Sequence, residues 1–212
     1  MKLIEKTIIE FIDEIDSPSP APGGGSVSAL IGSLGVSLSK MVGHLTINKK
    51  KFKGLSNEIQ EEFIKRLDEL GAIKDELNVM IDKDTEAFNY VMAAFKLSKE
   101  TEEEKVIRKE VIEAATYKAI DVPIMIAKLS YRGLELIDYF LEYGNKNAIT
   151  DLGVSSLLLT AALEGAILNV LVNLPGINDD EYVKNNKLEC SRLAKKGLEI
   201  KSRIMNVVMS NL

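Results

Sequence analysis

The sequence places one carboxylic acid, Asp84, on the apolar face of a predicted helix. Apolar side chains surround it at spacings of three and four residues, at Leu77, Met80, Phe88 and Val91. This spacing turns Asp84 toward the buried side of the helix. Burial raises the pKa of a carboxyl group, which can then both accept and donate a proton near neutral pH. The position predicts a general acid–base group or, alternatively, a buried ion pair or a hydrogen bond to a neighbouring helix end.

Two polar residues of a later helix, Asp151 and Asn169, point in the same direction. They are 18 residues apart, which at ~100° per residue places them on one face but about 27 Å apart along the axis. One compact site within one subunit cannot use both. Asp151 alternatively complements the helix dipole, as an acid in the first turn does, and Asn169 alternatively bridges two helices.

A glycine-rich turn, Gly23, Gly24, Gly25 and Ser26, follows a proline-rich strap and opens a predicted helix. Exposed N–H groups at a helix N-terminus can bind an anion or a carbonyl oxygen. The segment matches neither the GxxxxGKS/T phosphate loop nor the GxGxxG dinucleotide loop. The alternative is a tight turn between the strap and the helix.

Cationic side chains gather in one segment, at Lys49, Lys50, Lys51 and Lys53. They form either a solvated loop or an anchor for a ligand tail that is rich in carboxylates. The single histidine, His44, lies just before them. It packs or caps a helix end or, within a cleft, titrates near neutral pH as an acid or base.

Helical periodicity along the whole chain predicts an all-α protein. Only 5 prolines occur, and no Asn-Gly or Asp-Gly hairpin turn is present. We expect one domain, residues 1–212, folded as an antiparallel helical bundle of about six mostly long helices. The predicted helices span approximately residues 2–15, 23–45, 55–96, 101–143, 147–174 and 179–212, with a basic loop at 48–54.

Two of the predicted helices carry many small residues. Ser28, Gly32, Gly35 and Ser39 form a stripe that predicts a central helix with closely packed neighbours. Residues 152–174 contain one charge and are long enough to span a membrane. Their small and polar side chains favour the middle of a soluble bundle or a subunit interface instead. We therefore expect no membrane partner and a homodimer.

Composition excludes several function classes. The chain has 212 residues, 46% of them hydrophobic and 28% charged, and a net charge of −5. An acidic chain without a long basic run is not expected to bind nucleic acid. One Cys and one His exclude an intrachain disulfide and clustered Cys or His metal sites. A reducing, cytoplasmic location fits this composition, and the acidic start without a small-residue cleavage site is not expected to be a secretory signal.

Several segments, taken in order, resemble the formiminotransferase-cyclodeaminase C-terminal family, which also includes stand-alone methenyltetrahydrofolate cyclohydrolases. The resemblance covers about residues 1–200. The segments that carry it are 20–30 (PAPGGGSVSAL), 41–46, 49–52, 84–88 (DTEAF), 93–97, 122–123, 144–154 (GNKNAITDLGV) and 165–170. One departure is Asn48, which stands where the family pattern has Gly.

The resemblance implies an all-helical, dimeric enzyme of one-carbon folate metabolism that needs no metal and no cofactor beyond its tetrahydrofolate substrate. The first expectation is a formiminotetrahydrofolate cyclodeaminase, which forms 5,10-methenyltetrahydrofolate and releases ammonia. The alternative is a methenyltetrahydrofolate cyclohydrolase, which opens the same ring to 10-formyltetrahydrofolate. A more remote alternative is a non-catalytic folate-binding or structural protein.

The resemblance also suggests roles for the candidate residues. Both reactions pass through a cationic amidinium and a tetrahedral intermediate, so a carboxylate that pairs with the cation and moves a proton suits both. Asp84 is the first choice for this role and Asp151 the second. The remaining candidates are substrate-binding: the turn at Gly23–Ser26, Asn147 and Asn169 for the pterin or the p-aminobenzoyl amide, Lys49 and Lys50 for a glutamate or polyglutamate tail, and His44.

Overall fold

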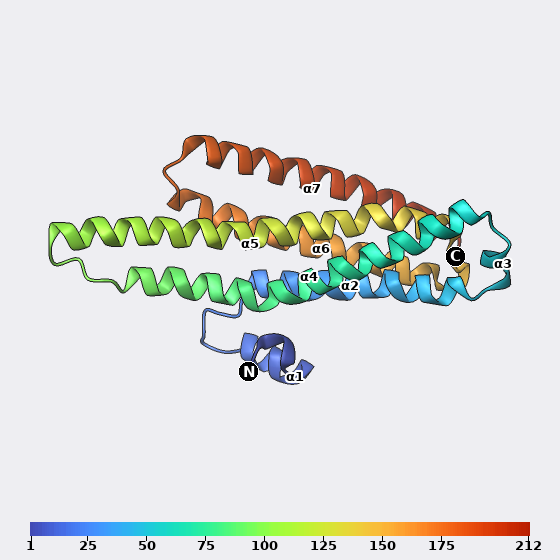
Figure 1. Cartoon of the computed structure of the whole chain (residues 1–212), viewed down its shortest axis with the longest axis horizontal. Coiled ribbons are helices and arrows are strands. Elements are labelled where there is room, and N and C mark those ends of the chain that lie inside the picture. The colour runs from blue at the N-terminus through green and yellow to red at the C-terminus, as the bar shows by residue number, and fades with distance from the viewer.

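The structure is a computed structural model that describes residues 1–212. It is all-α, as predicted, with seven α-helices and no strand (Figure 1). The helices are α1 (Ile8–Ile15), α2 (Gly24–Ile47), α3 (Lys50–Lys53), α4 (Asn57–Phe95), α5 (Glu102–Tyr143), α6 (Ile149–Asn173) and α7 (Asp180–Met209). Short 3-10 turns occur at Leu3–Glu5, Lys146–Ala148 and Leu174–Gly176.

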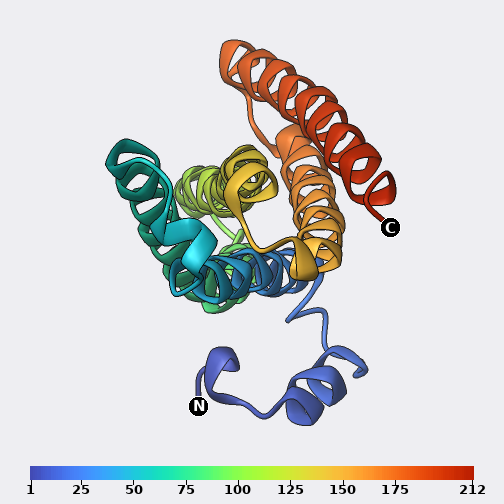
Figure 2. The same ribbon diagram turned by 90° about the vertical axis from the view of Figure 1, so that its right-hand side faces the viewer.

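Helices α2, α4, α5 and α6 form the body of the bundle. Helix α7 covers α5 and α6 on one side (Figure 2). The core contains large, fully buried side chains from α4, α5 and α6, such as Phe63, Phe140 and Leu159, whereas α2 contributes smaller ones, such as Ala29 and Val36. At the end of the bundle beside α3, the rings of Phe63 and Phe140 lie 4.7 Å apart between centroids, a distance at which aromatic pairs stabilise a core beyond their buried area.

The small-residue stripe of α2 faces inward, as predicted. A Cβ added to Gly35 would lie 2.9 Å from Leu159 Cγ of α6, so the two backbones approach closely only because Gly stands there. The opposite side of α2 is not enclosed and exposes Leu34, Met41 and Leu45. Helix α2 is therefore less central than the sequence predicts.

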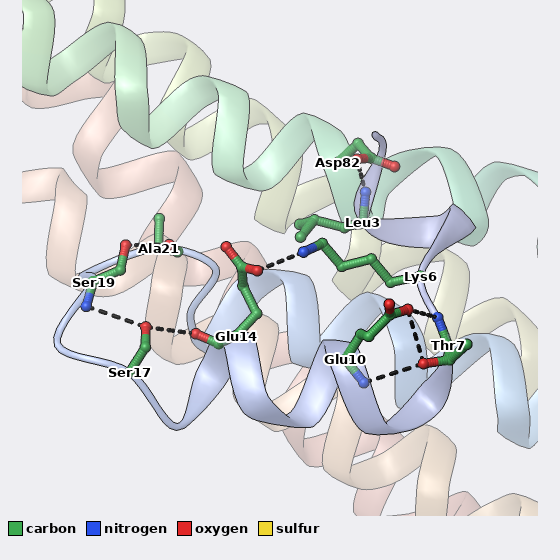
Figure 3. Close-up of polar contacts among 9 residues, drawn as sticks. All are labelled: Leu3, Lys6, Thr7, Glu10, Glu14, Ser17, Ser19, Ala21 and Asp82. Carbon is green, nitrogen blue, oxygen red and sulfur yellow. Dashed lines mark hydrogen bonds and ion pairs between the residues drawn. The ribbon is translucent and has the colours of Figure 1, made fainter.

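The N-terminal helix differs from its prediction of residues 2–15. Leu3–Glu5 form a 3-10 turn, and Thr7 then begins a new helix, α1, with a capping box to Glu10. The backbone N–H of Leu3 donates to Asp82 Oδ1 at 2.6 Å, which ties this segment to α4 (Figure 3). Helix α1 lies to one side of the four-helix body (Figures 1 and 2) and packs against it through Phe11, which is buried with the core.

The strap between α1 and α2 is held by polar contacts of its own (Figure 3). The Ser17 hydroxyl donates to the Glu14 carbonyl at 2.7 Å, and the Ser19 hydroxyl donates to the Ala21 carbonyl at 2.6 Å. The strap is bent at residues 16–18, 20 and 22, and these two hydrogen bonds hold its course between α1 and α2.

The basic segment at 48–54, predicted as a loop, contains the one-turn helix α3. Its Phe52 side chain is buried, with its ring centroid 4.9 Å from that of Phe63 and the two rings tilted. The following helix starts at Asn57, capped by Ser56, and not at Leu55. The aromatic anchor explains the difference, because burial of Phe52 orders a turn whose lysines carry no apolar periodicity.

Helices α4 and α5 extend beyond α2 and α6 as a projecting hairpin, on the left in Figure 1. The predicted capping box at Thr101 and Glu104 begins α5, and Pro123 lies inside that helix. The hairpin exposes apolar side chains, among them Tyr90, Phe95 and Val106.

Two segments, Gly24–Ile47 and Lys146–Gly176, are long and apolar enough to cross a membrane by length and composition. In their most apolar windows, 56% and 44% of the residues are buried inside the protein. Core helices of soluble proteins pass the same test.

Candidate active site

The N-terminus of α2 opens into a cleft of about 320 Å³ between α4, α5 and α6. The strap, α2, α4, α5 and α6 all contribute to it. We call it the Asp84 cleft; its lining residues are Pro20, Ala21, Gly23, Gly24, Asp84, Phe88, Val91, Ala119, Asn169, Val172 and Asn173. Four of the residues that the sequence predicts as site residues, Gly23, Gly24, Asp84 and Asn169, thus meet in one place.

The Asp84 carboxylate caps α2 from the neighbouring helix α4. The backbone N–H of Ser26 donates to Asp84 Oδ2 at 2.9 Å, and the Ser26 hydroxyl lies 3.3 Å from the same oxygen. The N-cap residue Gly23 has no side chain that could do this. The hydrogen bond to a neighbouring helix end, one alternative for Asp84, is therefore present.

The other carboxylate oxygen, Asp84 Oδ1, accepts no hydrogen bond from the chain, and the residue lines the cleft. Burial raises the pKa of Asp84, and the two hydrogen bonds from Ser26 counteract part of that rise. Asp84 is thus a fixed carboxyl group whose proton affinity is higher than usual and whose free oxygen is available to a ligand.

Steric constraints explain why glycine occupies positions 24 and 25. A Cβ on Gly25 would overlap the Asp84 carboxylate, and a Cβ on Gly24 would lie 3.1 Å from Asn169 Nδ2. Gly25 therefore allows the carboxylate to sit directly against the backbone of α2. The N–H groups of Gly24 and Gly25 belong to the first turn, where no intrahelical acceptor exists.

Two amide side chains from the last turns of α6 complete the cleft. Asn169 Nδ2 donates to the Gly165 carbonyl at 2.8 Å, and Asn173 Nδ2 donates to the Ala119 carbonyl of α5 at 3.2 Å. Asn173 thus bridges two helices. No hydrogen bond within the chain reaches the amide oxygen of either side chain, so both can accept from a ligand.

A second cleft, of about 290 Å³, lies at the other end of α2. We call it the lysine cleft; its lining residues are Thr46, Lys49, Lys51, Phe52, Tyr143, Gly144, Asn145, Lys146 and Asn147. It contains three cations and no acid, whereas the Asp84 cleft contains an acid and no cation. Asn48 at its edge has φ −91° and ψ −4°, a conformation that does not require Gly.

The two clefts divide the predicted site residues. Lys49 and Asn147 belong to the lysine cleft, about 36 Å from the Asp84 cleft along the 24 residues of α2. His44, Lys50 and Asp151 line neither cleft. His44 and Lys50 are exposed, and Asp151 is half-buried in the first turn of α6.

Comparison with known proteins identifies the family of the chain. The sequence profile of the formiminotransferase-cyclodeaminase family matches residues 7–192. The chain belongs to this family. The match includes the glycine-rich turn, Asp84 and both amides of the Asp84 cleft.

Three relatives are similar to this chain over nearly its whole length. A methenyltetrahydrofolate cyclohydrolase of Methylorubrum extorquens is 35% identical over 207 residues, or 98% of each protein. The formimidoyltransferase-cyclodeaminase of Gallus gallus is 34% identical over 93% of this chain, which spans 35% of that longer protein. The crystal structure of a formiminotetrahydrofolate cyclodeaminase from Thermotoga maritima matches 97% of both chains with a TM-score of 0.84 and 25% identity.

The structure also adds residues that the sequence did not single out for the site. Phe88 and Val91 belong to the apolar stripe of α4, but they line the Asp84 cleft. Their position next to Asp84 on one helix face is the signal that could have identified them. Lys146 joins the lysine cleft although it is distant in sequence from Lys49 and Lys51. Only the tertiary contact between the segment before α6 and the end of α2, where the Asn145 N–H donates to the Thr46 hydroxyl, reveals this.

Proposed function

We propose that the chain is a folate enzyme that acts on the one-carbon bridge between N5 and N10 of tetrahydrofolate, as a 5,10-methenyltetrahydrofolate cyclohydrolase. The observation that carries this proposal is Asp84, which lines the cleft with its Oδ2 fixed at the N-terminus of α2 and its Oδ1 without a hydrogen-bond donor from the chain. End-to-end similarity to the cyclohydrolase of Methylorubrum extorquens supports this choice of reaction.

In this reaction, water adds to the cationic methenyl carbon. Asp84 pairs with the cation, accepts a proton from the attacking water as general base, and leaves a tetrahedral carbon that bears a hydroxyl group. The bond from that carbon to N5 then breaks, and Asp84 returns a proton to N5 as the hydroxyl proton leaves for solvent. The products are 10-formyltetrahydrofolate and one proton. A raised pKa suits a carboxyl group that both accepts and donates.

The rest of the cleft suits the pterin and the developing hydroxyl oxygen. The free N–H groups of Gly24 and Gly25 can donate to that oxygen, as preorganised backbone donors do in other tetrahedral intermediates. Asn169 and Asn173 offer amide oxygens to the pterin N–H groups. Phe88 provides an aromatic surface for the ring. Asp151 lines neither cleft, so we assign the proton transfer to Asp84.

The second candidate is the formiminotetrahydrofolate cyclodeaminase reaction, favoured by similarity to the proteins of Gallus gallus and Thermotoga maritima. Here N10 attacks the protonated formimino carbon and loses its proton to Asp84. Asp84 then protonates the departing nitrogen, and ammonia leaves as 5,10-methenyltetrahydrofolate forms. The same carboxyl group serves both reactions, because each adds a nucleophile to the same carbon.

One assay distinguishes the two reactions. The purified protein is mixed separately with 5,10-methenyltetrahydrofolate and with 5-formiminotetrahydrofolate, and the methenyl absorbance is followed against a protein-free blank. A faster decay of the first substrate identifies a cyclohydrolase. Growth of absorbance from the second, with ammonia release, identifies a cyclodeaminase. If neither rate exceeds the blank, the enzyme proposal is wrong and a folate-binding or structural role replaces it.

A further inference from the structure

The segment that precedes α2 is joined to one turn of α4 at both of its ends. We call residues 3–22 the N-terminal arm; it comprises the first 3-10 turn, α1 and the strap. At its start, the Leu3 N–H donates to Asp82 Oδ1 at 2.6 Å. Just beyond its other end, the Ser26 N–H donates to Asp84 Oδ2 at 2.9 Å. The N-terminal arm is therefore an arc that leaves α4 and returns to it two residues away.

The strap at the end of the N-terminal arm forms part of the candidate active site. Pro20 and Ala21 line the Asp84 cleft together with Gly23 and Gly24 of the glycine-rich turn. Under the proposed function, on which this inference rests, the folate substrate occupies this cleft. The position of the N-terminal arm therefore sets one wall of the space that the substrate enters.

Apolar packing fixes the N-terminal arm only weakly. Phe11 is the one buried side chain between residues 1 and 21. A cavity of about 310 Å³ remains between the arm and helices α2 and α4, and its lining is apolar except for Lys6. Because so little apolar area is buried, the hydrophobic effect stabilises this position of the arm only slightly. Polar contacts have to hold it.

A series of polar contacts begins at Asp82 and follows the N-terminal arm (Figure 3). The Leu3 N–H donates to Asp82, and the Leu3 carbonyl accepts from the Lys6 N–H at 3.2 Å. The Lys6 ammonium group then pairs with the Glu14 carboxylate across α1. The Glu14 carbonyl accepts from the Ser17 hydroxyl at 2.7 Å. The series thus connects the anchor on α4 with the start of the strap.

The series continues through the strap to the cleft. The Ser17 hydroxyl accepts from the Ser19 N–H at 3.2 Å, and the Ser19 hydroxyl donates to the Ala21 carbonyl at 2.6 Å. Ala21 lines the Asp84 cleft. The half-buried residues between positions 1 and 21 all belong to this series; they are Leu3, Lys6, Glu14 and Ala21. The residues that the arm turns toward the protein are therefore, apart from Phe11, those that link Asp82 to the cleft.

We propose that Asp82 is a positioning residue for the folate reaction, which anchors the N-terminal arm and through its polar contacts holds Pro20 and Ala21 at the substrate. Asp82 itself does not line the cleft. Without the anchor, the substrate has to order the strap when it binds, and this ordering weakens binding. The loss affects the substrate and the transition state alike, so it raises KM and leaves kcat unchanged.

Two single variants test the ends of the series. Asp82→Ala removes both acceptor oxygens at the anchor, and Ser19→Ala removes the last hydrogen bond before the cleft. We expect each variant to raise KM at least about threefold, the effect of one lost hydrogen bond. We expect kcat to stay within about twofold of the wild type. A loss of kcat in Asp82→Ala with KM unchanged would overturn the positioning role.

Each variant has a matched control. Asp82→Asn retains an acceptor oxygen for the Leu3 N–H and should keep KM close to that of the wild type. Ser210→Ala is the control for Ser19→Ala, because the Ser210 hydroxyl also donates to a backbone carbonyl, that of Val207, but at the end of α7. An increase in KM for Ser210→Ala as large as that for Ser19→Ala would show that the effect does not come from the strap.

The double variant Asp82→Ala, Ser19→Ala tests whether the two ends act together. Effects of distant, independent substitutions add in free energy, so their increases in KM would multiply. If both residues act through one series of contacts, the double variant should have the KM of the more affected single variant. Multiplied increases would show that the two residues act separately and would overturn the proposal.

Amide hydrogen exchange tests the series without a substrate. The Ser19 N–H is bonded to the Ser17 hydroxyl in the strap, whereas the Ser26 N–H is bonded to Asp84 beyond it. We expect Asp82→Ala to speed exchange at Ser19 at least about threefold and to leave exchange at Ser26 unchanged, because only the arm is released. Unchanged exchange at Ser19 would show that Asp82 does not hold the strap.

The outcomes separate this inference from the proposed function. If the wild type turns over a folate substrate and Asp82→Ala keeps the wild-type KM, the positioning role is wrong and the proposed function stands. If the wild type is inactive on both folate substrates, the proposed function fails, and with it the role of Asp82 in that reaction. Exchange at Ser19 then decides whether Asp82 holds the strap at the cleft.

Discussion

Asp84 of α4 accepts a hydrogen bond at 2.9 Å from the backbone N–H of Ser26, although the two residues are 58 positions apart. This contact makes a side chain of one helix the N-terminal cap of another. It fixes the carboxylate beside the glycine-rich turn, where the residue lines the cleft. Burial raises the pKa of Asp84, and the hydrogen bond from Ser26 lowers it.

Asp84→Asn should reduce kcat for the folate reaction by about 10²–10⁴-fold, the usual contribution of a positioned acid–base group. The amide retains the hydrogen bond from Ser26 but cannot move a proton. Asp82→Asn is the matched control, because Asp82 contacts the N-terminal segment and does not line the Asp84 cleft. Steady-state rates of both variants decide this, and equal loss in both would assign the effect to the fold.

The same variant should change how stability depends on pH. In the folded protein, burial raises the pKa of Asp84 above its value in the unfolded chain. Below about pH 4, near the usual pKa of Asp, both states are protonated and the stabilisation from holding a neutral carboxyl group is fully present. It is lost as the pH rises through the folded-state pKa.

Urea unfolding of wild type and Asp84→Asn between pH 4 and neutrality measures this effect. We expect the free energy of unfolding of the wild type to fall relative to the variant as the pH increases. A difference that does not vary with pH would contradict a raised pKa of Asp84.

Ser26→Ala should shift the pH profile of the reaction. Both hydrogen bonds from Ser26 lower the pKa of Asp84, and the substitution removes the one from the hydroxyl group. The pKa of Asp84 should therefore rise further, and the acidic limb of the kcat/KM profile should move to higher pH. Ser37→Ala is the control, since the Ser37 hydroxyl bonds only to the Ser33 carbonyl within α2. An unchanged acidic limb would show that a group other than Asp84 causes it.

Gly25→Ala should be far more harmful than Gly23→Ala. The new Cβ at position 25 overlaps the Asp84 carboxylate, whereas at position 23 it meets only the Pro20 carbonyl oxygen, at 3.5 Å. Overpacking of this kind costs about 1–3 kcal/mol, while Gly23→Ala should lie within about 1 kcal/mol of the wild type. Thermal unfolding of the two variants tests this, and similar melting temperatures would mean that the carboxylate moves aside freely.

Much of the fold could be predicted from local pattern. The all-α class, the capping box at Thr101 and the inward stripe of α2 all follow from residue type and helical spacing. The N-terminal helix and the segment at 48–54 could not be predicted in the same way. Lys6 ends the first turn and Thr7 begins α1 through a capping box, and Phe52 orders α3 by contact with Phe63, a residue of the following helix.

For the candidate site, the sequence by itself determined that Asp84 lies on an apolar helix face, because helical periodicity fixes which way a side chain points. It also indicated that Asp151 and Asn169 cannot share a compact site, because the rise of a helix per residue is constant. Only the tertiary structure decided that Asn169 and Gly24 meet Asp84 while Lys49 and Asn147 lie at the opposite end of α2. Which residues of different helices come together depends on how the helices pack against one another, and contacts between side chains distant in sequence determine that packing.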